Sequence, residues 1–364
     1  MDSGKAALGH VRLGHDAGMR LFRRDARPHE PAAAISAFWE WWEAEGRAAV
    51  TQALEDRDPQ RVSDALSEAV ASVHPDLAWE LAAGDLAQHV LVVTAEGDPE
   101  LRPLATRWLR ASPGVDETWE YAASRLPAPD VEQIVLGLEN REVAFSDVLV
   151  GARREGCHLE VSVYHPLFRE LEEQVRGQVA FLALDAALGE DDVEAWVGEI
   201  TPSTEPPLDG FGLSALRSVV RDLRDDNTDP DGSPQWVIME GQGVDGPVMA
   251  LAQVPLSPTT APTFDTHVAV LVPYTDLTEQ GYPGPGSLGA LRALEEHLGE
   301  RINGSGRIVA HQSHRGMRVL HIYVDSTTPA VEQMRAAVEA WDQGRIRVQV
   351  TPDPGWHNVA HLRS

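Results

Sequence analysis

The chain of 364 residues contains a single cysteine, Cys157. One cysteine cannot form an intramolecular disulfide, and it cannot anchor a zinc site that is built on several thiolates. It lies in a strand-like segment, CHLEVSVY, where a small buried apolar residue is the ordinary expectation. The sequence therefore offers no disulfide framework and no sign of a thiol nucleophile.

Long apolar segments and basic residues are also scarce. No run approaches the roughly 20 apolar residues that a membrane-spanning helix needs, and the first 30 residues lack the apolar stretch of a secretory signal. We therefore expect no membrane partner and a cytoplasmic location. The 30 Lys+Arg residues are outnumbered by 57 Asp+Glu residues, so the formal net charge is -27. This charge repels nucleic acid and favours a basic protein as partner.

The familiar catalytic and cofactor motifs are missing. There is no G-x-S-x-G elbow, P-loop, HExxH helix or EF-hand loop. The segment GPGSLG (284–289) matches G-x-G-x-x-G, but no parallel βαβ pattern follows it, so we interpret it as a turn and helix start. The segment HQSH (311–314) places its histidines on opposite faces of a strand unless a turn joins them with His321 or Asp325. We expect no cofactor and no metal.

The composition that remains is typical of a soluble globular protein, with 43% hydrophobic and 24% charged residues. The length favours about two domains. We predict an extended or disordered tail over 1–30, an N-terminal α+β domain with a mostly antiparallel sheet over 31–224, and a second domain over 235–364. The acidic, Pro/Gly-rich segment DDNTDPDGSP (225–234) is the predicted linker.

The N-terminal region alternates helix and strand signals. Ile35, Phe38, Trp39 and Trp42 recur at helical spacing, which indicates a buried helix. So many tryptophans could form a ligand platform, but packing in a core is the favoured interpretation because indole rings bury so much area. Strands are predicted over 89–97, 118–124, 144–152, 157–164 and 194–200.

The second domain has a clearer pattern. WVIMEGQ and PVMALAQV flank Asp245-Gly246, which predicts a β-hairpin. A strand, a helix, two strands, a helix and a strand follow over 267–350, which is the ferredoxin-like β-α-β-β-α-β order. Right-handed crossovers predict the strand order 4-1-3-2, with both helices on one face.

One strand of this domain carries unusual polar residues. In HRGMRVLHIYVD (314–325), Leu320, Ile322 and Val324 should face the helices, so His321 and Tyr323 should lie on the opposite face. We expect this face to bind a partner, or else to pack on the first domain or on the hairpin. The candidate binding residues are His311, His314, Arg315, His321, Tyr323, Arg345 and Arg347.

Three segments of this domain carry a family resemblance. GYPGPGSLGALRALEEHL, HRGMRVLHIYVD and DPGWHNVAHL resemble segments of a bacterial family, domain of unknown function family 695, over about residues 235–362. The topology is similar in outline to the B-type regulator of ribonuclease E activity, a ferredoxin-like protein inhibitor. The family has no established activity, so the resemblance implies no catalytic residue. His321 stands where the family tends to have an aromatic residue.

Two functions from different classes follow as hypotheses. The first is a non-enzymatic protein-binding or regulatory module, because catalytic motifs are missing and the charge is strongly negative. The alternative is a hydrolase or small-ligand enzyme with a polar site between the domains, in which Glu80, His165 and Glu190 would act as general acids or bases. Glu190 could equally start a helix and face water. Self-association through a sheet face or edge is a third possibility.

Overall fold

The structure is a computed structural model that describes residues 31–138, 141–243 and 246–363. Helices and strands combine with antiparallel sheets, which confirms the α+β class. The predicted tail over 1–30 lies outside the described residues. No helix within the described ranges is both long enough and apolar enough to cross a membrane.

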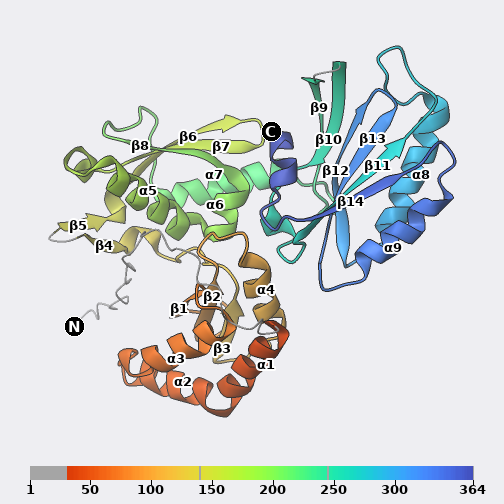
Figure 1. The fold of residues 1–364 in the computed structure, drawn as a ribbon. Coiled ribbons are helices and arrows are strands. Elements are labelled where there is room, and N and C mark those ends of the chain that lie inside the picture. The colour runs from red at the N-terminus through yellow and green to blue at the C-terminus, as the bar shows by residue number, and fades with distance from the viewer. Residues whose placement is uncertain (1–30, 139–140, 244–245, 364) are drawn as a thin grey trace.

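Residues 31–124 form a first lobe with its own core (Figure 1). Its elements are α1 (Pro31–Trp41), a π-helical turn (Trp42–Gly46), α2 (Arg47–Glu55), α3 (Gln60–Val73), β1 (Ala78–Ala83), β2 (His89–Thr94), α4 (Arg102–Arg110) and β3 (Trp119–Ala122). The strands pair in the order β1-β2-β3. Trp42, Trp108 and Trp119 are fully buried, so the tryptophans do pack in the core as interpreted from the sequence.

Residues 125–234 form a second lobe around a second core. Its elements are β4 (Val135–Leu138), β5 (Arg141–Ala144), β6 (Leu149–Glu155), β7 (His158–Tyr164), α5 (Glu173–Leu188), α6 (Glu190–Trp196), β8 (Val197–Ser203) and α7 (Leu213–Asp226). Strands β6, β7 and β8 form one sheet, and β4 and β5 form a two-stranded ribbon. Cys157 is buried in this core, as its apolar surroundings predict.

The expected single N-terminal sheet is therefore divided between two lobes. The reason is that β2 pairs with β3, and β7 with β8, in parallel. A parallel pair needs a crossover connection, which is α4 in the first lobe and α5 with α6 in the second. Each crossover packs on the sheet of its own lobe, so each lobe has a separate hydrophobic core. The predicted strand over 194–200 accordingly begins as the end of α6 and becomes β8 only at Val197.

Residues 235–363 form the third lobe, which holds one six-stranded sheet. Its elements are β9 (Trp236–Gly243), β10 (Gly246–Gln253), β11 (Thr266–Pro273), α8 (Pro285–Arg301), β12 (Gly306–His314), β13 (Met317–Val324), α9 (Ala330–Ala337), β14 (Arg347–Pro352) and a final 3-10 helix (His357–Leu362). The strand order is β14-β11-β13-β12-β10-β9. Counted along the chain from β11, the first four strands in this list stand as 4-1-3-2, and the β9–β10 hairpin extends the sheet beyond β12.

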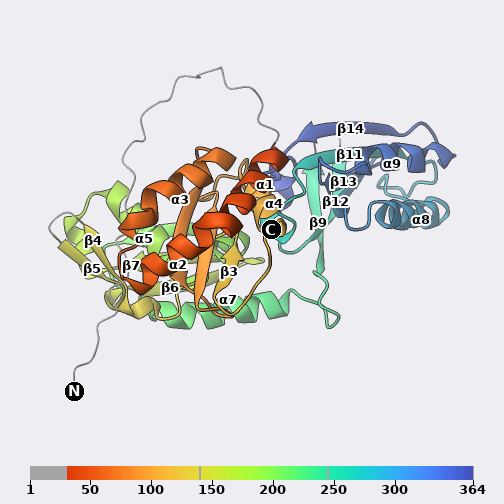
Figure 2. The ribbon, with the colours of Figure 1, turned by 90° about the horizontal axis from the view of Figure 1, so that it is seen from below.

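The two faces of this sheet are covered differently. Helices α8 and α9 lie on one face, where Val270, Leu320 and Ile322 form a fully buried core (Figure 1). The C-terminal segment returns across the opposite face, which is turned toward the first two lobes (Figures 1 and 2). There the indole of Trp356 stacks on the ring of Tyr323, with the centroids 4.4 Å apart.

Candidate functional site

The predicted binding face of the third lobe has the expected orientation but is closed. His321 and Tyr323 do lie on the side opposite α8 and α9. Tyr323 is 0% exposed and His321 only 6% exposed, because Trp356 and the C-terminal segment cover them. The sequence left open whether this face binds a partner or packs on the first domain or the hairpin. In the structure the C-terminal segment, which was not among those alternatives, covers it. A segment that carries a tryptophan gains most by burying it against an available aromatic surface, and the sheet offers Tyr323.

His311 faces the other way from the prediction. A β-bulge between Ile308 and Ala310 shifts the register, so that His311 lies opposite Leu320 on the helix side. Its Nδ1 atom is 3.4 Å from a carboxylate oxygen of Glu295 in α8. One inserted residue moves every following side chain of a strand to the other face. Gln312, instead of His311, therefore lies on the face that carries His321.

The other predicted binding residues do not gather into one site. The Nδ1 atom of His314 is 2.9 Å from the carbonyl oxygen of Pro247. Arg315 is an exposed turn residue with a positive φ of 43°. Arg345 and Arg347 are exposed at the far edge of the sheet, and Arg345 precedes β14. These arginines are surface residues beside a covered face.

A chain of polar groups runs under the C-terminal segment instead. The Nε2 atom of His267 lies 3.0 Å from Nδ1 of His321, and Nε2 of His321 lies 2.9 Å from the amide nitrogen of Gln312. The same amide nitrogen lies 2.8 Å from Nε2 of the exposed His361. Because an amide NH₂ only donates, both rings must accept from Gln312, so His321 carries its proton on Nδ1 and donates it to His267.

This arrangement keeps the buried histidines neutral. Desolvation lowers the pKa of His321 to about 3, with further lowering by His267, His361 and His311. Desolvation also lowers the pKa of His267, although Asp353 acts in the opposite sense. A protonated His321 would bring a second donor against Gln312. These groups therefore form a structural network rather than an acid–base pair poised near neutral pH.

The alternative acid–base set is not assembled as one site. The Glu190 carboxylate is 7% exposed and accepts hydrogen bonds from the Thr94 hydroxyl, the Gly97 N–H at 2.9 Å and the Arg125 N–H at 3.2 Å. The Arg102 guanidinium lies 3.6 Å from its Oε1 atom. Both oxygens are therefore engaged in holding the first lobe to α6. Glu190 does start a helix, as one alternative had it, but it is buried rather than solvated.

Glu80 and His165 have separate surroundings. Glu80 accepts a hydrogen bond from Nε of Arg125 at 2.7 Å. His165 is buried in the second lobe, where its Nδ1 atom accepts from the Leu167 N–H at 3.1 Å. Burial lowers the pKa of His165. The two glutamates thus converge on Arg125, whereas the described contacts of the histidine involve neither, so the three do not form a catalytic set.

The glycine motif and the metal motif also have structural roles. The carboxylate of Asp276 accepts a hydrogen bond from the Gly286 N–H at 2.7 Å, at the start of α8, where a dinucleotide phosphate would otherwise be held. The side chain of Asp276 thus takes the N–H group at the helix start that a phosphate would need. Within the described ranges, no group of three or more His, Cys, Asp and Glu residues is placed to hold a metal ion.

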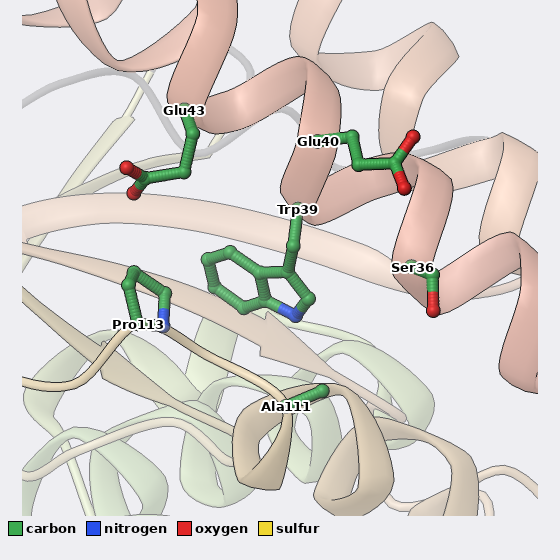
Figure 3. A pocket seen from close by; sticks show the side chains of 6 residues that line it. All are labelled: Ser36, Trp39, Glu40, Glu43, Ala111 and Pro113. Carbon is green, nitrogen blue, oxygen red and sulfur yellow. The ribbon is translucent and has the colours of Figure 1, made fainter.

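The first lobe has a shallow acidic hollow of about 440 Å³ beside the π-helical turn (Figure 3). It is lined by Ser36, Trp39, Glu40, Glu43, Ala111 and Pro113. Figure 3 shows Glu40 and Glu43 on the helix above the Trp39 ring. An indole with neighbouring carboxylates can accept a cationic side chain. Among the described contacts, no hydrogen bond joins the Ser36 hydroxyl to Glu40 or Glu43.

Comparison with known proteins identifies one part of the chain. Residues 250–359 match the model of a family described as "Family of unknown function (DUF695)". The C-terminal part of the chain is a DUF695 domain. No curated protein matches the chain, and no solved structure matches it. The family resemblance predicted from the sequence is thus confirmed, while β9 and the two N-terminal lobes lie outside the matched residues.

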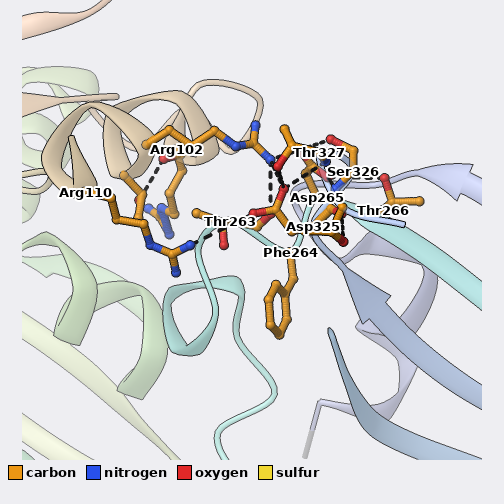
Figure 4. A network of polar contacts seen from close by, with 12 residues as sticks. Arg102, Arg110, Thr263, Phe264, Asp265, Thr266, Asp325, Ser326 and Thr327 are labelled. Atoms are coloured by element: carbon orange, nitrogen blue, oxygen red, sulfur yellow. Dashed lines mark hydrogen bonds and ion pairs between the residues drawn. The ribbon is translucent and has the colours of Figure 1, made fainter. Parts of the chain in front are cut away.

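An ion-pair network connects the DUF695 domain to α4 (Figure 4). The Nη2 atom of Arg107 lies 2.8 Å from Asp265 and 2.7 Å from Asp325. Asp265 also accepts from the N–H of Ser326 at 3.0 Å. Arg102, one turn and a half earlier on the same helix, contacts Glu190 of the second lobe. Helix α4 therefore holds both neighbouring lobes through arginines that the sequence analysis did not single out.

Strand β9 precedes the residues that match the family model. It is an edge strand of the six-stranded sheet. Trp236 is 42% exposed and Ile238 is 64% exposed, which is unusual for large apolar residues on an edge. The sequence predicted this hairpin, but it could not show which strand ends the sheet.

The backbone of β9 is also available for pairing. The carbonyl of Gln235 accepts a hydrogen bond from the Val254 N–H at 2.9 Å. Every second residue after Gln235 therefore forms its backbone hydrogen bonds with β10. In an antiparallel pair the alternate residues turn their N–H and C=O groups outward. Trp236, Ile238 and Glu240 therefore turn their backbone N–H and C=O groups toward the free edge, where no backbone hydrogen bond from another described segment reaches them.

Proposed function

We propose that this chain is a non-enzymatic protein-binding module that takes an extended, basic segment of a partner along β9. The free edge of β9 carries this proposal. An incoming strand would bond to the outward N–H and C=O groups of Trp236, Ile238 and Glu240. The exposed side chains of Trp236 and Ile238 would then contact alternate side chains of the added strand.

Charge supports a basic partner. Glu240 and the aspartates that precede β9, Asp225, Asp229 and Asp231, are all exposed. The whole chain carries a net charge of -27, so a positively charged segment would be steered toward it. A second copy of this chain would bring the same carboxylates to the same edge, and like charges would oppose that pairing.

A phage-displayed library of unbiased linear peptides, followed by anisotropy titration of the selected peptides, tests the proposal. We expect selected peptides that alternate apolar and Lys/Arg residues, and weaker binding as salt rises. The variant Ile238→Pro removes an outward N–H without breaking the β9–β10 ladder. It should weaken binding about 10-fold or more, because two main-chain hydrogen bonds of roughly 1 kcal/mol each are lost or distorted.

The matched control is Ile238→Thr, which keeps the N–H and a β-branched side chain and should bind more tightly than the proline variant. Circular dichroism would verify that both variants fold. Equal binding by Ile238→Pro, or selection of acidic peptides only, would overturn the proposal. A dimer in analytical ultracentrifugation that Ile238→Pro dissociates would also overturn it, since the edge would then belong to a second copy.

A further inference from the structure

A second hollow, of about 530 Å³, lies where α4 of the first lobe meets the DUF695 domain. Arg110 comes from the last turn of α4. The opposite wall comes from the loop before β11, the end of α8 and the start of β12. Its lining includes Arg110, Pro262, Phe264, Asn303, Arg307 and Ile308.

Arg307 is the unusual group of this hollow. It is half-buried, and it forms no ion pair with a carboxylate in the part of the chain that the structure describes. Its Nη2 atom donates to the carbonyl oxygen of Thr260 at 2.8 Å. Desolvation lowers its pKa. A guanidinium has five N–H donors, and a half-buried one gains most from an anion that can take the remaining donors.

Arg110 adds a second cation to the same hollow. Its side chain is 59% exposed, and its closest carboxylate oxygen, on Asp325, lies 4.0 Å away. Asp325 is already bound to Arg107 at 2.7 Å and to the Thr327 hydroxyl at 2.7 Å (Figure 4). The residues that line the hollow thus include two guanidinium groups, those of Arg110 and Arg307, and no carboxylate. The lining of the hollow is thus positively charged in a chain whose net charge is strongly negative.

We propose that this hollow binds a small anionic ligand whose carboxylate or phosphate group lies between the guanidinium groups of Arg110 and Arg307. Planar guanidinium groups suit both anions, because they donate paired hydrogen bonds. The rings of Pro262 and Phe264 and the side chain of Ile308 would contact an apolar part of the ligand. The C-terminal end of α8 borders the hollow, and the partial negative charge of its carbonyl groups does not favour an anion. The attraction for the ligand must therefore come from the arginines.

The proposal is independent of β9. The hollow is lined by the loop before β11 and by the start of β12, whereas β9 is the outer strand of the hairpin at the sheet's edge. Arg110 belongs to α4 and Arg307 to the DUF695 domain. A ligand held by both would therefore bridge the first lobe and the DUF695 domain, and it would stabilise their contact by mass action.

Isothermal titration of the full chain with phenyl phosphate, phenylacetate and inorganic phosphate tests this site. We expect saturable one-to-one binding of at least one aromatic anion, and no binding of neutral benzyl alcohol. Tighter binding of phenyl phosphate than of phenylacetate would identify a phosphate site, and the reverse order a carboxylate site. Inorganic phosphate should bind more weakly than phenyl phosphate, because it cannot contact Phe264.

Two variants locate the site. Arg307→Gln should weaken binding at least 10-fold, and Arg110→Gln should weaken it less, since Arg110 is more exposed. The control Arg292→Gln removes the same charge from an exposed position of α8 outside the hollow and should leave the affinity unchanged. Absence of saturable binding up to the solubility of all three anions, or equal affinity in Arg307→Gln, would overturn the proposal.

Discussion

The Nε2 atom of His267 and the Nδ1 atom of His321 lie 3.0 Å apart, and the two imidazole rings stack with an interplanar angle of 21°. Both rings are buried between the DUF695 sheet and the C-terminal segment. A single shared proton satisfies this contact, so a second proton would disrupt it. The pair therefore makes the stability of the domain sensitive to acid.

The first prediction is that stability falls as the pH drops below about 6.5. The pKa of His321 is lowered to about 3 in the folded chain, so the unfolded chain binds more protons between these two values, and unfolding is favoured as pH falls. At about pH 5 this one histidine should cost about 2 kcal/mol relative to neutral pH. Urea unfolding of the wild type and of His321→Gln at both pH values measures the difference.

We expect the loss between the two pH values to be smaller in His321→Gln than in the wild type. The control is His357→Gln, because His357 is exposed and its ring has no described hydrogen bond. An unchanged pH dependence in His321→Gln would show that other groups govern acid unfolding.

The second prediction concerns Glu295 on α8. Its carboxylate lies 2.8 Å from Arg318, which is only 4% exposed, and 3.4 Å from His311. Although burial acts to raise the pKa of Glu295, these two partners hold it below its usual value. Glu295→Gln leaves the buried guanidinium of Arg318 without a carboxylate and should cost about 2–3 kcal/mol in the free energy of unfolding. Chemical denaturation with the exposed neighbour variant Glu296→Gln, expected to lie within about 0.5 kcal/mol of wild type, is the comparison.

The third prediction concerns the junction between α4 and the DUF695 domain. Arg107→Gln removes the cation that neutralises Asp265 and Asp325, so the two carboxylates should repel each other and loosen the junction. We expect a loss of about 2 kcal/mol and faster hydrogen exchange at the N–H groups of Ser326 and Thr327. Arg61→Gln, which breaks an exposed ion pair with Asp56, should change stability by less than about 1 kcal/mol. Unchanged exchange at the junction would contradict the assigned role of Arg107.

The fourth prediction concerns the cover of the sheet. Trp356 is 1% exposed and stacks on Tyr323, so Trp356→Ala should cost about 3–5 kcal/mol and should expose the face that carries His321. The matched variant Trp236→Ala removes the same side chain from the exposed edge strand and should cost less than about 1 kcal/mol. Thermal unfolding compares the two. A loss of less than about 1 kcal/mol in Trp356→Ala would mean that the cover contributes little to stability.

Local patterns in the sequence were sufficient for much of the third lobe. Alternation placed Leu320 and Ile322 toward the helices and Tyr323 away from them, because strand periodicity is a local property. The hairpin around residues 244–245 followed from turn chemistry, although those two residues lie outside the described ranges. The burial of Trp39 and Trp42 in the first lobe followed from helical spacing.

The candidate site was harder to predict, because it depends on contacts between distant segments. Nothing near His311 signals the bulge that reverses its direction. Nothing near Tyr323 indicates that Trp356 will return to cover it, since the two are joined only by tertiary packing. The roles of Arg107 and Arg110 were missed because an arginine in a helix is ordinary until its distant partner is known. A basic residue at the end of a helix in an acidic chain was the one available signal.

The arginines of α4 have a consequence for the separated parts of the chain. If residues 235–364 were produced alone, Asp265 and Asp325 would remain adjacent at the turn before α9, but no guanidinium would lie between them. Their mutual repulsion would weaken the hydrogen bonds that these carboxylates accept from the N–H groups of Ser326 and Thr327. The excised fragment would then begin to fray at this turn, although its strands and helices would be unchanged in sequence.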